Sequence, residues 1–195
     1  MDYELIVVGA SWGGLHAVGT LLEGLGTQTS AAVVIAQHRN AAGSDELADL
    51  LQLHTELPVR DAEDKDQILP GTVLLAPKDY HLLIESGGTV ALSTEERVRY
   101  ARPSIDVLFE TAADAYREKC VGVVLTGANE DGAAGLARIN ALGGVAIVQD
   151  PGSAERAEMP AAALAATAAD IVLPLEQIGL FLHGLLLETR TRSLT

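Results

Sequence analysis

The chain has 195 residues, and its 48% hydrophobic and 21% charged residues fit one compact domain and exclude a disordered or fibrous segment. The formal net charge of −14 would repel phosphate backbones and anionic lipid headgroups, so we expect neither nucleic acid nor a membrane surface as a partner. A lone Cys120 excludes an internal disulfide, and no apolar stretch approaches the ~18 residues of a membrane span, so we expect a cytoplasmic protein without membrane insertion.

Short runs rich in Val, Ile and Leu alternate with stretches that have helical patterns. Runs of this length are typical of strands buried on both faces, as in a parallel sheet. The alternation predicts an α/β fold: a doubly wound, mostly parallel sheet with helices on both faces. The predicted strands are 4–9, 31–36, 121–126, 144–149 and 170–173. The predicted helices are 13–25, 43–54, 104–118, 132–142, 159–168 and 175–188.

The middle of the chain has a different pattern. Three apolar runs at 72–77, 81–85 and 89–94 are closely spaced, and Ser86-Gly87-Gly88 between the last two is a hairpin turn signal. We expect an antiparallel hairpin that interrupts the parallel sheet. The acidic stretch 60–67 is interpreted as solvated surface. No internal repeat or long linker is visible, so residues 1–195 are expected to form a single domain.

Polar residues follow the first strand, at the edge of the sheet where ligands gather in parallel α/β folds. Ser11 lies in Gly9-Ala10-Ser11-Trp12-Gly13, a G-x-S-x-G pattern between strand and helix. A nucleophile on so tight a turn is expected to have strained backbone angles, and its hydroxyl would lie at the amino end of the next helix. There the Trp12 N–H is the natural first donor to an oxyanion.

Two further strand ends supply the partners that a serine nucleophile needs. His38 follows the second strand and could take the proton of Ser11, because a neutral hydroxyl is a poor nucleophile at pH 7. Asp131 follows the 121–126 strand and could fix the tautomer of the histidine, although spacing leaves Glu130 as a rival carboxylate. Ser, His and Asp in this chain order match none of the α/β-hydrolase, chymotrypsin and subtilisin orders.

Each of these residues also has a structural interpretation. A Gly-rich turn after a strand is as often a phosphate or dinucleotide loop, although G-x-G-x-x-G fails at Ser11 and no Gly-Lys-Ser/Thr follows. His38 could be a surface histidine, and Asp131 could simply cap the following helix. No pair of histidines has a zinc spacing and a single cysteine cannot form a cysteine-rich site, so we predict no metal.

Seven motifs together resemble a known family: GASWGG, AQHRN, LLAPKDYHLLI, RPSIDVLF, LTGANEDGAAGL, GGVAIVQDP and AEMPAAAL. In order and spacing, over about residues 4–180, they are similar to the catalytic domain of the chemotaxis protein-glutamate methylesterases (CheB type). The resemblance implies a serine hydrolase, without a cofactor, that demethylates glutamate esters on the cytoplasmic region of methyl-accepting chemoreceptors and deamidates certain glutamines. It also implies that Ser11 is the nucleophile, His38 the general base and Asp131, rather than Glu130, the orienting carboxylate. Backbone N–H groups at Trp12 and Ala128 would hold the oxyanion.

The chain departs from the family pattern at two places. Gly-Ser-Thr/Ala-Gly-Gly becomes Gly-Ala-Ser-Trp-Gly-Gly, which puts the indole of Trp12 beside the nucleophile. Gly-Met-Gly becomes Gly127-Ala128-Asn129, which removes a large side chain near the oxyanion. The two changes are either compensatory repacking or a pocket reshaped for another ester. The alternatives are therefore an esterase or amidase for a different substrate, and a non-catalytic binding module of chemosensory signalling.

Partner recognition and regulation have weaker signals. Many members of this family carry an N-terminal receiver domain, whereas the first catalytic strand here begins at Glu4, so we expect no receiver domain in this chain, which is either a stand-alone member or part of a longer protein. A separate response regulator or signalling protein is expected as a further partner. Arg39 and Arg102 are candidate contacts to an acidic receptor surface. Pro103 and Ser104 form a typical helix start, with Asp106 favourable in the first turn.

Overall fold

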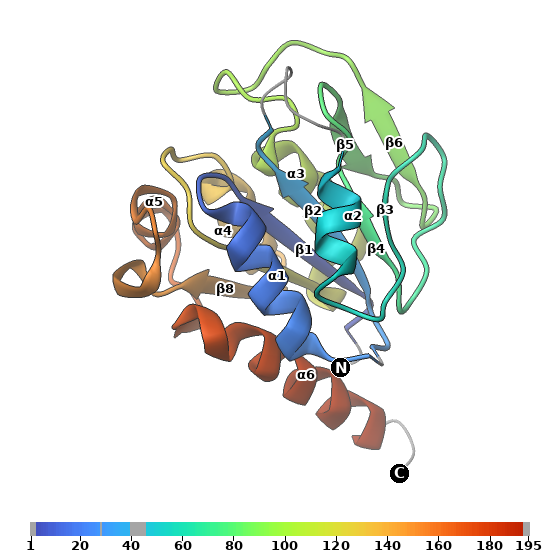
Figure 1. Ribbon diagram of the computed structural model, residues 1–195, viewed down its shortest axis with the longest axis vertical. Coiled ribbons are helices and arrows are strands. Elements are labelled where there is room, and N and C mark those ends of the chain that lie inside the picture. Colours follow the sequence, from blue (N-terminus) through green and yellow to red (C-terminus); the bar gives the residue numbers. More distant parts are fainter. Residues whose placement is uncertain (1–2, 28, 40–45, 193–195) are drawn as a thin grey trace.

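A seven-stranded parallel sheet forms the centre of the protein, seen in a computed structural model that describes residues 3–27, 29–39 and 46–192. Its strand order is β3-β4-β2-β1-β7-β8-β9, and every neighbouring pair is parallel (Figure 1). The strands are β1 (Leu5–Ala10), β2 (Ala32–Gln37), β3 (Val59–Asp61), β4 (Val73–Leu75), β7 (Cys120–Val124), β8 (Val145–Gln149) and β9 (Ile171–Leu173).

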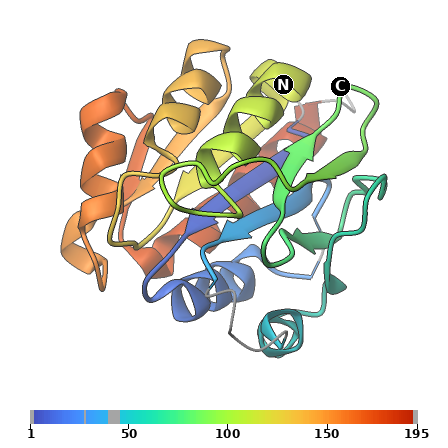
Figure 2. The same cartoon turned by 90° about the horizontal axis from the view of Figure 1, so that it is seen from above.

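Helices cover both faces of this sheet. In Figure 2, α3 (Ile105–Tyr116), α4 (Ala133–Ala141) and α5 (Glu158–Ala166) lie on one side, and α1 (Gly14–Leu25) and α2 (Leu47–Gln52) lie on the other. The long α6 (Leu175–Arg192) packs along α1. Short 3₁₀ helices, η1 (Arg117–Lys119) and η2 (Pro151–Ser153), flank β7 and β8. The doubly wound α/β fold is thus confirmed.

Two hydrophobic cores fill the layers on the two sides of the sheet. One contains Phe109 of α3 and Leu136 of α4, and the other contains Leu21 of α1 and Ile178 of α6. All residues of β1 and β7 are buried, as continuous apolar runs in a parallel sheet require. In the part of the chain that the structure describes, no helix is both long and apolar enough to cross a membrane.

The predicted hairpin is present as β5 (His81–Ile84) and β6 (Val90–Ser93), which pair antiparallel, and β5 packs against α3. The run at 72–77 is different, because its residues form β4 and pair parallel with β2. Most of 60–67 is exposed, as interpreted, but the stretch is not all loop, because Arg60 and Asp61 belong to β3. A three-residue, half-exposed edge strand has no apolar run to announce it.

The helix predictions hold with shifted ends. The prediction for 43–54 corresponds to α2, although 43–45 lie outside the described residues. The prediction for 104–118 covers α3 and the first part of η1. Ser104 is the N-cap of α3, with its side chain accepting from the Val107 N–H, so the predicted helix start is confirmed.

The strand order determines where a site can form. β1 lies between β2 and β7, and the chain builds one half of the sheet outward from β2 and the other outward from β7. At such a switch point the loops at the carboxyl ends of adjacent strands diverge and leave a crevice. The three loops that sequence analysis singled out follow these three strands.

Candidate active site

Ser11 extends the ladder of β1 by one residue before the chain turns. Its N–H donates to the carbonyl of Thr126 (3.0 Å), and its own carbonyl accepts from the Gly14 N–H (2.9 Å), which closes the turn into α1. The expected backbone strain at the nucleophile is absent, since Ser11 is not among the described non-glycine residues with positive φ. Gly13 instead takes the left-handed conformation, with φ of 76°, where glycine pays no Cβ penalty.

The loop after β7 passes so close to Ser11 that only glycine fits. A Cβ on Gly127 would lie 3.0 Å from the Cβ of Ser11 and 2.5 Å from the Cε of Met159. Gly127 is also tied in place by its carbonyl, which accepts from the Met159 N–H (2.9 Å). The Gly-rich sequence after β7 therefore lets the loop after β7 approach the turn that holds Ser11.

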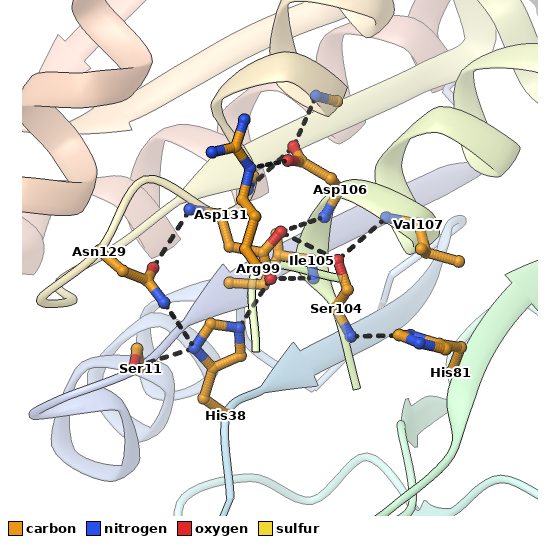
Figure 3. A network of polar contacts seen from close by, with 12 residues as sticks. Ser11, His38, His81, Arg99, Ser104, Ile105, Asp106, Val107, Asn129 and Asp131 are labelled. Atoms are coloured by element: carbon orange, nitrogen blue, oxygen red, sulfur yellow. Dashed lines mark hydrogen bonds and ion pairs between the residues drawn. The ribbon is translucent and has the colours of Figure 1, made fainter. Parts of the chain in front are cut away.

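His38 lies between the other two predicted catalytic residues (Figure 3). Its Nδ1 is 3.2 Å from the Oγ of Ser11, and its Nε2 is 2.7 Å from Oδ2 of Asp131. Because an ionised carboxylate can only accept, Nε2 carries the proton in the neutral ring and Nδ1 is left as the acceptor. The structure thus brings Ser11, His38 and Asp131 together in the order that a nucleophile, a base and an orienting group require.

Asp131 is completely buried, yet four donors surround its carboxylate. Besides His38, it accepts from the Ser104 hydroxyl (2.9 Å) and from the N–H groups of Ile105 (2.8 Å) and Asp106 (2.9 Å) at the start of α3. Burial alone would raise the pKa of this carboxyl, but the bonds from His38 and from the two backbone N–H groups outweigh burial and lower its pKa. Asp131 is therefore ionised where it faces His38.

The structure also decides between the two rival carboxylates. The side chain of Glu130 is 65% exposed and pairs with Arg99, while Asp131 is the carboxylate that contacts His38. Adjacent residues at a strand end point in different directions, so one faces the crevice wall and the other faces solvent. Chain spacing treats the two residues alike, and the contact agrees with the family resemblance, which implied Asp131.

Sequence analysis did not predict the contacts that three further polar residues make in the site. Asn129 contacts His38 from a second side: its Nδ2 lies 3.3 Å from Nδ1 of His38, and its Oδ1 accepts from the Asp131 N–H (3.2 Å). Ser104 was predicted only as a cap, and it also donates to Asp131. His81 accepts from the Ser104 N–H (3.2 Å) with Nδ1 and bonds the carbonyl of Glu96 with Nε2 (3.0 Å). No sequence signal links these positions, although Asn129 lies two residues before Asp131.

Trp12 and Ala128 flank the crevice as exposed positions. The indole of Trp12 is 58% exposed, but it does not hang free: Nε1 donates to Glu155 (2.8 Å), and the guanidinium of Arg156 lies 5.4 Å from the ring centroid. The Trp12 carbonyl accepts from the Thr126 hydroxyl (3.0 Å). The oxyanion roles of the two backbone N–H groups stay predictions.

Arg39 and Arg102 line one pocket beside His38. Neither is a freely exposed charge: Arg39 is 8% exposed and pairs with Asp61 (2.7 Å), and Arg102 is 18% exposed and pairs with Asp79 (2.9 Å). Arg102 also donates to the carbonyls of residues 94 and 95, so it holds the loop before α3 together. Their role in substrate binding stays a prediction.

Residues 6–182 match the model of one protein family, CheB methylesterase. The chain belongs to the CheB methylesterase family. A Leptospira interrogans protein, named as a candidate protein-glutamate methylesterase/protein-glutamine glutaminase, is 49% identical over 178 residues, which are 91% of this chain and 92% of the relative.

Other members of the CheB family are longer or more distant. Protein-glutamate methylesterase/protein-glutamine glutaminase 2 of Caulobacter vibrioides is 38% identical over 180 residues, which cover 90% of this chain and 52% of that protein. This chain thus spans about half the length of the Caulobacter relative. The crystal structure of the Thermotoga maritima CheB methylesterase catalytic domain aligns with a TM-score of 0.89 at 31% identity, over 95% of this chain and 100% of that one. The family resemblance and the fold predicted from the sequence are both confirmed.

Proposed function

We propose that this chain is a serine hydrolase that demethylates glutamate γ-methyl esters on the cytoplasmic region of methyl-accepting chemoreceptors and deamidates glutamines there. The observation that carries the proposal is the line of contacts from Ser11 through His38 to the buried, ionised Asp131. The choice of substrate is supported by the names of the Leptospira and Caulobacter relatives, which state both activities. The work would be done in the cytoplasm by one catalytic domain built on the single parallel sheet.

In the proposed mechanism, the Oγ of Ser11 attacks the ester carbonyl carbon while Nδ1 of His38 takes the hydroxyl proton. The negative charge on the carbonyl oxygen is held by the backbone N–H of Trp12, at the start of α1, with that of Ala128 as a second donor. His38 then returns its proton to the leaving methoxide, which departs as methanol. Water, deprotonated by the same nitrogen, hydrolyses the acyl-enzyme to glutamate and free serine. For a glutamine substrate the leaving group is ammonia.

In these reaction steps, Asp131 holds His38 in place and stabilises its protonated form. The Nε2–H bond to Asp131 keeps Nδ1 pointed at Ser11 in the neutral ring, and the carboxylate offsets the charge that appears when Nδ1 gains a proton. Because Asp131 is itself bonded by three groups of the α3 start, the ring has little freedom to turn away.

The test is methanol release from methylated chemoreceptor fragments by the native chain and by Ser11→Ala, beside a generic nitrophenyl ester. We expect release that falls by at least about 10³-fold in Ser11→Ala, with the unfolding transition unchanged. Activity on the nitrophenyl ester without release from the receptor would contradict the substrate and favour the esterase alternative. Release that persists in Ser11→Ala would contradict the mechanism.

A further inference from the structure

A pocket of about 220 Å³ lies beside His38 and Asn129, and four arginines line it: Arg39, Arg97, Arg99 and Arg102. The whole chain has 13 Lys and Arg against 27 Asp and Glu, so four arginines around one pocket are a local concentration of cationic donors, although each of them already pairs with a carboxylate. Guanidinium groups present several N–H donors in a planar fork that matches carboxylates. The lining of this pocket therefore points to an anionic ligand next to the proposed nucleophile.

The backbone presents two of these side chains in an unusual way. Mutual hydrogen bonds between Val98 and Ala101 (3.1 and 2.8 Å) close a two-residue turn whose central residues, Arg99 and Tyr100, have φ of 48° and 65°. Positive φ is unfavourable for residues with a Cβ and is concentrated at ligand-binding segments. Tyr100 is 95% exposed, so its own burial does not compensate the strain. We name residues 97–102 the arginine turn.

The ion pairs within the arginine turn leave capacity for another carboxylate. Arg97 and Arg102 both donate to the same oxygen of Asp79, at 2.7 and 2.9 Å, so two guanidinium groups share one acceptor atom. Arg97 and Arg99 are 46% and 43% exposed, and Arg99 pairs with Glu130 and with Asp106. Exposed pairs of this kind contribute little free energy, so an incoming carboxylate can replace or join the internal partner.

The size and surroundings of the pocket favour a protein over a small molecule. Its volume is below the ~300–1,000 Å³ of typical small-molecule sites and suits a single side chain. Tyr100, in its lining, is exposed, and the exposed indole of Trp12, beside Ser11 in the chain, contacts Glu155 and Arg156. Exposed Trp and Tyr together with Arg are the residues enriched where proteins bind proteins tightly.

We propose that the arginine turn is a docking site for carboxylate side chains of the protein substrate, close in sequence to the glutamate ester that reaches Ser11. The proposal rests on the proposed function, because it takes the ester at Ser11 as the point from which the neighbouring acidic residue is measured. It adds a specificity determinant, with Arg97 and Arg99 as the accessible groups, to the chemistry of the three catalytic residues.

The test uses two synthetic peptides that each carry one glutamate γ-methyl ester. The positions three and four residues to either side hold glutamates in one peptide and glutamines in the other, so that a helical peptide presents them on the same face as the ester. Binding of both peptides to the full chain with Ser11→Ala is measured by fluorescence anisotropy at low ionic strength. We expect the acidic peptide to bind about fivefold more tightly, the size of one favourable exposed ion pair, and the ratio to shrink as salt is added.

Substitutions locate the effect. Adding Arg97→Gln is expected to bring the ratio of the two affinities close to one, while Arg97→Lys keeps most of it because the charge remains. The matched control is Arg138→Gln, an exposed arginine that pairs with Asp114 between α3 and α4, and it should retain the full ratio. Equal binding of both peptides, no binding of either, or a full ratio in Arg97→Gln would each overturn the docking site.

Turnover by chains with Ser11 intact separates this proposal from the proposed function. Methanol release that requires Ser11 but is equal for the acidic and neutral peptides contradicts only the docking site. Charge-dependent binding to the Ser11→Ala chain, combined with methanol release that does not require Ser11, contradicts the catalytic assignment and supports the docking site.

Discussion

The amino-terminal ends of α3 and α4 each hold a buried carboxylate that belongs to the other helix. Asp131, which precedes α4, accepts from the N–H groups of Ile105 and Asp106 at the start of α3. Asp106, in the first turn of α3, accepts from the N–H groups of Gly132 (2.9 Å) and Gly135 (2.8 Å) at the start of α4. This exchange fixes the two helices to each other and satisfies N–H groups that a helix leaves without intrahelical partners.

The two carboxyls nevertheless have opposite pKa shifts. Burial raises the pKa of Asp106, and the nearby charge of Asp131 raises it further. The backbone bonds from Gly135 and Gly132 and the charge of Arg99 lower the pKa, but by less, so the net shift is upward. At Asp131 the bond from His38 and the two backbone bonds from α3 overcome burial, and the pKa falls. The difference teaches that N–H groups at a helix start do not by themselves lower the pKa of a buried carboxyl. At Asp131 the hydrogen bond from the His38 imidazole is the largest of the effects that lower the pKa.

The largest effect is expected from Asp131→Asn, which removes the charge of the carboxylate that contacts His38. The amide cannot offset the charge on His38 and favours the wrong tautomer, so we expect kcat/KM for ester hydrolysis to fall by about 10⁴-fold. Glu130→Gln, one residue away and solvent-facing, should stay within about threefold of native, because only its exposed pair with Arg99 is lost. Steady-state methanol release measures both variants. A larger loss in Glu130→Gln would show that the wrong carboxylate has been assigned to His38.

Ser104→Ala removes one donor from Asp131 and the N-cap of α3 together. We expect unfolding to become easier by about 1–2 kcal/mol, from the lost cap and the missing bond to a buried carboxylate. Esterase kcat should fall by about tenfold with KM nearly constant, because the effect acts through the position of His38.

Urea unfolding and steady-state kinetics test Ser104→Ala, with Ser30→Ala, at the amino end of β2 on the opposite edge of the sheet, as the control. A variant with native kcat would mean that the Ser104 hydroxyl serves only as a helix cap.

The smallest effect is expected from Asp106→Asn, which changes how stability depends on pH. A carboxyl whose folded-state pKa is raised above its ordinary 3.8 contributes stability that is fully present below that value and lost as pH rises through the folded pKa. The asparagine Oδ1 can still accept from Gly132 and Gly135 but carries no charge. Relative to native, the variant should therefore gain stability as pH rises from about 4 to about 7, by less than Ser104→Ala costs.

Urea unfolding across this pH range measures the gain in Asp106→Asn. Asp114→Asn, an exposed carboxyl in the same helix, is the matched control and should show no comparable trend. A relative stability of Asp106→Asn that falls with rising pH would reverse the assigned direction of the pKa shift.

The difference between prediction and structure follows the range of the interactions. The strands 4–9 and 121–126 were predictable because their apolar runs are local. The alternation of strand and helix patterns predicted a parallel sheet, and with it a site at the carboxyl ends of the strands. β3 was missed because an edge strand needs only one neighbour and little burial. His81 lies at the start of a hairpin strand, where nothing local marks it as part of the site, yet its ring accepts a hydrogen bond from Ser104, 23 residues away. The conformation of the arginine turn could not be predicted from the sequence either, because neither Arg nor Tyr favours positive φ.

By itself the sequence determined the fold class, the family resemblance and the three residues, Ser11, His38 and Asp131, that the structure brings into one line of contacts. It could do so because strand propensity and loop position are encoded in consecutive residues. Only the tertiary structure showed that Asp131 contacts His38 while Glu130 faces solvent, as the family resemblance implied, that Gly13 rather than Ser11 takes the left-handed turn, and that the start of α3 supplies three donors to Asp131. Those outcomes depend on how segments distant in the chain pack, and burial and hydrogen-bond direction exist only once they have packed.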